Sequence, residues 1–181
     1  MADTVLVRAP TRSGRPASAL RTARLQTQAL SWASTQAVRQ RMQRQRTRDT
    51  APELAVRRLL HRAGLRYRVD TPPLPGMRRR ADVVFRPARV ALFVDGCFWH
   101  GCPQHGSRAT HANTGYWAQK VVRNQERDRT TDEALAQAGW LAIRAWEHEG
   151  PASVAARVAE AVVRRRQERE TLRTAPRTAA A

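Results

Sequence analysis

The chain of 181 residues has few acidic residues, a single lysine, two cysteines and no long apolar run. Without about 18 consecutive apolar residues, no segment is expected to span a membrane. We expect no secretory signal either, because the N-terminus lacks an apolar core. The two cysteines lie beside histidines, and we interpret them as metal ligands or thiols rather than as a disulfide framework. The length is that of one ordinary domain.

The scarcity of acid leaves a large basic surplus. The chain has 33 Lys and Arg residues against 15 Asp and Glu residues, a formal charge of +18. Such a surplus favours polyanions as partners, because Arg and Lys neutralise phosphates, and nucleic acid is the leading expectation. The preference for Arg over Lys, with Lys120 alone, is also typical of a GC-rich genome. That bias does not explain why carboxylates are so few.

Residues 1–32 are expected to form a disordered basic arm, because they combine Pro, Ser, Thr, Gly and Arg without periodicity. Across residues 1–48 there are ten arginines, and Asp3 is the single acid. A mitochondrial transit peptide has a similar composition, but an arm that gathers DNA is favoured. The basic segment 34–48 is expected to become ordered against DNA or against the domain.

Residues 33–169 predict one mixed α/β domain, and residues 170–181 a flexible tail. A helix is predicted to begin at Thr50, with Glu53 three residues later, and to end at Gly64. Alternation and short apolar runs then predict strands at 65–69, 81–85, 90–94 and 140–146. Two further helices are predicted at 116–138 and 151–169, and a Gly- and His-rich loop at 96–115. This order indicates a mixed central sheet flanked by helices.

Two acids are placed at the ends of neighbouring strands. Asp82 begins one predicted strand and Asp95 follows the next. If the strands pair as a hairpin, the two side chains can converge at one edge of the sheet. Carboxylate oxygens with water and phosphate oxygens suit Mg²⁺, which can assist phosphodiester hydrolysis. Ordinary turn formation at strand ends is the alternative.

A cluster of Cys and His residues indicates a second metal site. Cys97, Cys102 and His105 lie within nine residues, and His148 follows the last predicted strand. Together they form a Cys₂His₂ set, which is typical of structural Zn²⁺ with no open position. His100 lies between them and stays available for proton transfer or phosphate contact. The alternative is a pair of unliganded thiols in a loop.

The same loop carries two large aromatic residues, Phe98 and Trp99. In a DNA-binding protein such side chains can enter between base pairs and partly unstack them. The alternative is that both rings pack onto the domain beneath the loop.

Five sequence blocks together resemble the very short patch repair (Vsr) endonucleases. They cover roughly residues 33–149, and they are Phe93-Val-Asp95-Gly-Cys97-Phe-Trp-His100-Gly-Cys102-Pro-Gln-His105, Arg48-Asp-Thr-Ala-Pro-Glu53, Arg80-Ala-Asp82, Asn124-Gln-Glu-Arg127-Asp128 and Trp146-Glu-His148. The resemblance implies a fold similar to the PD-(D/E)xK nucleases. It also implies a Mg²⁺-dependent enzyme that nicks DNA 5′ of the thymine in T·G mismatches, which arise when 5-methylcytosine is deaminated.

The resemblance also assigns roles at the catalytic site. Asp82 matches the central metal ligand, and the backbone carbonyl of Val94 a second ligand. His100 matches a histidine that is proposed to transfer a proton. Glu53 matches an acidic residue on a helix near the catalytic site. Asp95 stands where the best-known members have histidine, which brings the site closer to a two-carboxylate plan. The usual nuclease lysine is missing, because Cys97 occupies its position.

For DNA recognition, Met42, Phe98 and Trp99 match the residues that wedge beside the mismatch. Phosphate contacts are expected from basic side chains, namely Arg48, Arg80, Lys120, Arg123 and Arg127. The resemblance further implies a bacterial cytoplasmic protein that acts as a monomer on mismatched double-stranded DNA, with a MutL-type repair protein as a further partner. Two alternatives stay open, a non-catalytic zinc-containing DNA-binding module and a restriction-type nuclease of the same fold.

Overall fold

The computed structural model describes residues 35–44, 46–106 and 114–174. The predicted N-terminal arm, residues 1–32, lies outside the described residues. So do residues 107–113 of the predicted loop and residues 175–181 of the predicted tail. No helix in the described part of the chain is both long enough and apolar enough to cross a membrane.

A four-stranded mixed sheet forms the centre of the domain. Its order is β1-β2-β3-β4, where the strands are β1 (Arg68–Thr71), β2 (Ala81–Phe85), β3 (Val90–Asp95) and β4 (Leu141–Trp146). β1 and β2 are antiparallel, as are β2 and β3, whereas β3 and β4 are parallel. The parallel pair requires a crossover, which the long helix α5 (Thr114–Gln137) provides.

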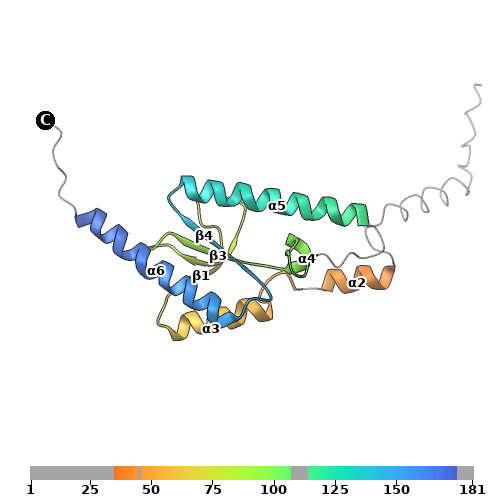
Figure 1. The fold of residues 1–181 in the computed structure, drawn as a ribbon, viewed down its shortest axis with the longest axis horizontal. Coiled ribbons are helices and arrows are strands. Elements are labelled where there is room, and N and C mark those ends of the chain that lie inside the picture. Colours follow the sequence, from red (N-terminus) through yellow and green to blue (C-terminus); the bar gives the residue numbers. More distant parts are fainter. Residues whose placement is uncertain (1–34, 45, 107–113, 175–181) are drawn as a thin grey trace, which may run out of the picture.

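Helices cover both faces of this sheet (Figure 1). Helices α3 (Ala51–Arg62) and α6 (Pro151–Thr174) lie together on one face, and α5 lies on the other. Two shorter helices, α2 (Gln36–Arg44) and α4 (Cys97–His100), lie toward the same end of the domain in Figure 1. The mixed α/β sheet flanked by helices that the sequence predicts is therefore confirmed.

The apolar core has two parts, one on each face of the sheet. The larger part joins α3 and α6 to the sheet through residues such as Leu60, Phe85, Leu92 and Val158, all fully buried. The smaller part joins Leu135 of α5 to β2 and β3. The central strands are buried on both faces, which explains why their sequences are continuous apolar runs rather than alternating patterns.

Most predicted boundaries agree with the structure, and the differences have local causes. β1 begins at Arg68 rather than 65, because Leu65 and Tyr67 pack into the core before the strand pairing starts. The predicted loop contains the short helix α4, and α6 continues to Thr174, five residues past its predicted end.

Candidate active site and metal centre

Asp82 projects from β2 at the point where the pairing between β2 and β3 changes. The regular register runs from Phe85↔Val90 to Val83↔Leu92. Beyond it, the backbone N–H of Val94 donates to Oδ2 of Asp82 at 2.7 Å. The carboxylate is therefore fixed beside the backbone of Val94, the residue whose carbonyl is the second predicted metal ligand.

The environment of Asp82 disfavours its charged form. Burial, together with the smaller effects of the neighbouring carboxylates Glu53 and Asp95, raises the pKa of Asp82 to about 6. The hydrogen bond from Val94 and the positive charge of Arg57 oppose this rise without cancelling it. A partly buried acid surrounded by other acids is a position where a divalent cation would be stabilised.

Glu53 lies in the first turn of α3, as the helix-start pattern predicts, and its side chain is buried. Its Oε1 accepts from the Thr50 hydroxyl at 2.8 Å, and its Oε2 accepts from the Asp49 amide at 3.0 Å and from Arg57 at 2.7 Å. Glu53 thus ties the helix start together while it adds negative charge near Asp82. These bonds give it a structural role whether or not it contacts a metal.

Asp95 ends β3, and its carboxylate is bonded to an arginine of the neighbouring strand. Both of its oxygens accept from Nη1 of Arg144, at 3.0 and 2.8 Å. His100 Nδ1 lies 3.6 Å from Asp95 Oδ1 and is hydrogen-bonded to Asp128 Oδ2. Among the described residues, a tight group of metal-ligating atoms at this edge contains Asp95, His100 and Asp128, but not Asp82. The carboxylate of Asp95 faces His100 and Arg144, and its charge contributes to the raised pKa of Asp82.

Helix α5 supplies the partner of His100. Asp128 lies on its buried stripe together with Trp117, Asn124, Thr131 and Leu135. Burial alone would raise the pKa of Asp128, but the hydrogen bond to His100 and the charges of Arg144 and Arg79 hold it below its usual value. An ionised Asp128 fixes the imidazole through Nδ1, which directs the other ring nitrogen, Nε2, away from this bond.

Arg144 connects the acids of this site, and sequence reasoning missed it. Its guanidinium bonds Asp95, and it also bonds Asp132 at 2.9 and 3.1 Å and approaches Asp128 at 3.4 Å. These acids surround the arginine and raise its pKa despite its burial. The available signal was a charged residue inside the otherwise apolar strand Leu141–Trp146. For Asp128 the available signal was an acidic residue at a position of α5 where the helical pattern otherwise predicts buried residues.

Replacing Arg144 by Leu is expected to destabilise the domain by about 2–4 kcal/mol at neutral pH, because three carboxylates lose their shared cation. The loss should shrink below about pH 4, where protonation of these acids removes their repulsion. Urea unfolding at both pH values measures the difference. Arg144→Lys is the matched control that keeps the charge. An equal loss for Leu and Lys at both pH values would show that side-chain shape, rather than charge, holds these acids together.

The Cys/His set predicted from the sequence is brought together in space. Cys97 begins α4 and Cys102 follows it, and both are buried; we call residues 97–102 the α4 segment. His148 follows β4. The four ligand atoms lie within 4.8 Å of one another. Sulfur to Nδ1 distances are 3.0 Å for Cys97–His148, 3.7 Å for Cys102–His148, and 3.9 Å from each cysteine to His105. A zinc tetrahedron with ordinary bond lengths has sulfur-nitrogen edges of about 3.6 Å. The donor set therefore fits Zn²⁺ in both chemistry and size.

The parallel pairing of β3 with β4 explains how the cluster forms. Asp95 pairs with Trp146, so the segments that follow the two strands emerge side by side. The Cys97 amide also donates to Glu147 at 2.8 Å, which joins the segments. Burial, together with the nearby Cys102 and Glu147, raises the pKa of the Cys97 thiol to about 11. A bound cation would reverse this effect, because it stabilises the thiolate.

Phe98 and Trp99 pack on the first turns of α5. Their ring centroids lie 5.2 and 5.6 Å from that of Trp117, which is itself buried. The Lys120 ammonium lies 5.1 Å from the centre of the Trp99 ring. Phe98 and Trp99 keep partial exposure. They form an aromatic group beside the Cys/His set, with the Lys120 ammonium above the Trp99 ring.

The predicted phosphate-binding residues occupy two regions. Arg48 and Arg80 both bond Asp70, at 3.0 and 2.8 Å, on the β1 side of the domain. Lys120, Arg123 and Arg127 lie on α5, where Arg127 bonds Asn124 and Arg123 is exposed. Met42 belongs to α2, but the structure describes only its backbone.

Comparisons with known proteins identify the family. A family model described as DNA mismatch endonuclease Vsr matches residues 33–105. The type II nicking enzyme V.NaeI of Lentzea aerocolonigenes is 47% identical over 110 residues, which cover 60% of this chain and 66% of that protein. V.XorIIP of Xanthomonas oryzae, also a type II nicking enzyme, is 42% identical over 111 residues, covering 60% and 77%. The DNA mismatch endonuclease Vsr of Escherichia coli is 38% identical over 101 residues, covering 56% and 63%.

The matched residues 33–105 of this chain contain both cysteines and His105 of the Cys/His set, together with Asp82, Asp95 and His100. The identity to V.XorIIP extends over more than two thirds of that relative. The chain therefore belongs to the Vsr family of endonucleases.

Proposed function

We propose that this protein is a Mg²⁺-dependent endonuclease that nicks one DNA strand on the 5′ side of the thymine in a T·G mismatch. The observation that carries the proposal is the arrangement of Asp82 and the His100–Asp128 pair beside the Cys/His set at one end of the sheet. The membership of the family supports a nuclease fold of the PD-(D/E)xK type and a DNA substrate.

In this proposal Asp82 and the carbonyl of Val94 hold Mg²⁺. The donor set fits, because the carboxylate is fixed against Val94 and repelled by its acidic neighbours. Mg²⁺ would supply Lewis-acid stabilisation of the charge that develops on the phosphodiester. Asp95 was a further predicted ligand, but Arg144 bonds both of its oxygens. We therefore assign Asp95 to the support of His100.

His100 is the group that moves a proton. Asp128 binds its Nδ1, so Nε2 is the nitrogen that can exchange a proton with the attacking water. Asp95 and Arg144 hold this pair in position from the sheet side. Zn²⁺ at Cys97, Cys102, His105 and His148 would act as a structural ion that fixes the α4 segment, and with it His100.

Mismatch selectivity is assigned to the aromatic group formed by Phe98 and Trp99. Entry of these rings into the duplex exchanges their contacts with Trp117 for base stacking. Unstacking costs least at a weak T·G pair, so deformability favours the mismatch. Met42 and the phosphate contacts of Arg48, Arg80, Lys120, Arg123 and Arg127 complete the proposed interface. Coupling to a MutL-type protein and a monomeric state stay predictions.

The test is a nicking assay on three otherwise identical duplexes that contain T·G, T·A or C·G at one position. We expect a nick in the T·G duplex with Mg²⁺, and none in the matched duplexes or with chelator. The second candidate function is cleavage of fully paired DNA, as by a restriction-type nuclease of the same fold; two relatives are named type II nicking enzymes rather than mismatch endonucleases. Cleavage of matched duplexes would select it. Binding without any cleavage would instead select the zinc-containing binding module.

A further inference from the structure

The C-terminal half of α6 carries an arginine-rich surface that the proposed active site does not use. Between Arg164 and Thr174 there are five arginines and two glutamates. Arg166, Arg169 and Arg173 are spaced i, i+3 and i+7, which places them on one face of the helix. Pro87 of the turn between β2 and β3 lines the same cavity as these three arginines. We call Arg166, Arg169 and Arg173 the α6 basic face.

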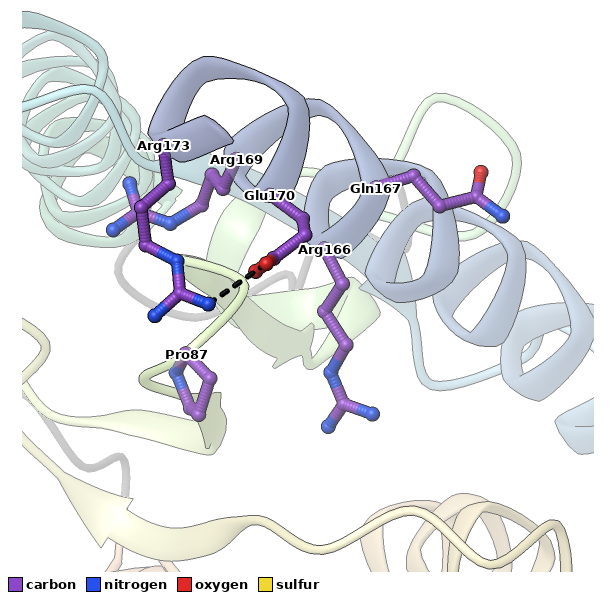
Figure 2. Close-up of a pocket in the computed structure, with 6 residues that line it drawn as sticks. All are labelled: Pro87, Arg166, Gln167, Arg169, Glu170 and Arg173. Atoms are coloured by element: carbon purple, nitrogen blue, oxygen red, sulfur yellow. Dashed lines mark hydrogen bonds and ion pairs between the residues drawn. The ribbon is translucent and has the colours of Figure 1, made fainter. Parts of the chain in front are cut away.

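The side chains of this face border a shallow cavity. Its volume is about 530 Å³, and its lining comprises Pro87, Arg166, Gln167, Arg169, Glu170 and Arg173. Figure 2 shows Arg166 and Arg173 extending from α6 toward the turn that carries Pro87, whereas Gln167 points away. Arg173 bonds Glu170 at 2.7 Å. Arg166 and Arg169 form no ion pair with any carboxylate among the described residues.

The requirements of the helix itself do not account for this face. The helix dipole favours a cation only within about the last turn, which explains Arg173 but not Arg166 two turns earlier. Like charges spaced i, i+3 or i+4 destabilise a helix by a few tenths of a kcal/mol per pair. Arg169 stands in this relation to both Arg166 and Arg173. Glu170 pairs with Arg173, but no described carboxylate pairs with Arg166 or Arg169, so an external anion would relieve the repulsion between them.

This surface lies at the opposite end of the sheet from the proposed active site. Arg165 of α6 bonds the carbonyl of Gly139, just before β4 begins, and Pro87 lies in the turn just before β3 begins. Asp95 and Trp146 end the same two strands. The five steps from Val90 to Asp95 span about 17 Å, which corresponds to about five base pairs of duplex DNA.

We propose that the α6 basic face binds the phosphate backbone of duplex DNA at a distance from the nicking site. The inference rests on the proposed function for its substrate. Guanidinium groups bind phosphate oxygens in a bidentate manner, and neutralisation of phosphates releases counterions. Three arginines on one helical face, with little competing acid, fit a continuous phosphate strand better than a single small anion.

The test compares two lengths of T·G duplex and a triple variant, Arg166→Gln with Arg169→Gln and Arg173→Gln. Gln keeps a high helix propensity, and circular dichroism checks the fold. A duplex of about 8 base pairs centred on the mismatch extends about four base pairs to each side, which is too short to reach this face, whereas one of about 30 base pairs is long enough. On the long duplex we expect the variant to lose about tenfold in affinity at 0.15 M salt, with a salt slope shallower by about 2 to 3. On the short duplex its affinity and nicking should match the wild type.

The matched control removes the same charge elsewhere, with Arg58→Gln, Arg62→Gln and Arg66→Gln, all exposed on the α3 side. A loss limited to the α6 variant and the long duplex supports the proposal. Unchanged affinity on the long duplex would overturn it, even if the face binds an acidic protein. Equal losses in both triple variants, or on both duplex lengths, would also overturn it, because they would reflect net charge alone. Failure of the wild type to nick T·G would reject the proposed function. The affinities for the short and the long duplex could still be compared, because binding is measured separately from nicking.

Discussion

Asp82→Asn is expected to abolish nicking and at the same time to stabilise the metal-free protein. Loss of the proposed metal ligand should lower the nicking rate by at least about a thousandfold, which corresponds to about 4 kcal/mol in the barrier. Asn keeps an oxygen that can accept from the Val94 amide. It also removes a negative charge that burial, Glu53 and Asp95 disfavour. The expected gain in unfolding free energy at pH 7 is about 1–3 kcal/mol.

The raised pKa of Asp82 predicts in which pH range Asp82→Asn is more stable than the wild type. The folded pKa of Asp82, about 6, lies above the ordinary value of 3.8. The folded state therefore holds this proton more tightly, and the contribution of Asp82 to stability falls as the pH rises from about 4 to about 6. Urea unfolding with chelator at pH 4.5 and 7.5 should show the variant gaining on the wild type only at the higher pH.

Asp70→Asn is the control for this sign. Arg80 and Arg48 hold the pKa of Asp70 below its ordinary value even though its partial burial opposes this. Its replacement should therefore cost stability at pH 7 rather than add to it. Full nicking by Asp82→Asn would contradict its role as a metal ligand. A less stable Asp82→Asn protein at pH 7 would contradict the electrostatic description of the site.

Cys102→Ser is expected to remove bound zinc and to cause the largest loss of stability. Structural zinc sites contribute their binding energy directly to folding, on the order of 10 kcal/mol in small domains. Here the ion would join the α4 segment to a sheet with its own core, so a loss of several kcal/mol is expected. Metal analysis of the purified protein should find one zinc per wild-type chain and almost none in the variant. Thermal unfolding should show the same loss for wild type treated with chelator.

His61→Gln is the matched control for the zinc prediction, since His61 is exposed on α3 and outside the Cys/His set. Its zinc content and thermal midpoint should equal those of the wild type. Purified wild-type protein without zinc, and with a thermal midpoint that chelator does not change, would exclude a structural zinc ion.

Strong local signals made much of the fold predictable. The apolar runs on either side of Arg86-Pro87 located β2 to the residue and β3 to within one residue. The Thr50 start and Gly64, which has a positive φ of 75°, delimited α3. β1 was predicted three residues early, because alternation reports burial and not strand pairing. Four residues of α4 are too few to show helical periodicity.

The site was predictable where one short segment carries the chemistry. Cys97, Cys102 and His105 share a loop, and His148 follows from the strand order. Asp128 and Arg144 were missed as site residues because their roles depend on how α5 and β4 lie against β3. Spacing along the chain does not encode such contacts. Only the tertiary arrangement shows that the acid at Asp95 is accompanied by a cation.

The measurement that tests the central claim most directly maps the cut in a T·G duplex labelled on each strand in turn. With Mg²⁺ the proposed function predicts a single break, in the thymine strand, at the phosphate 5′ to the mismatched thymine. The guanine strand and the matched duplexes should stay intact. Breaks in both strands, or equal cutting of the matched duplex, would contradict it.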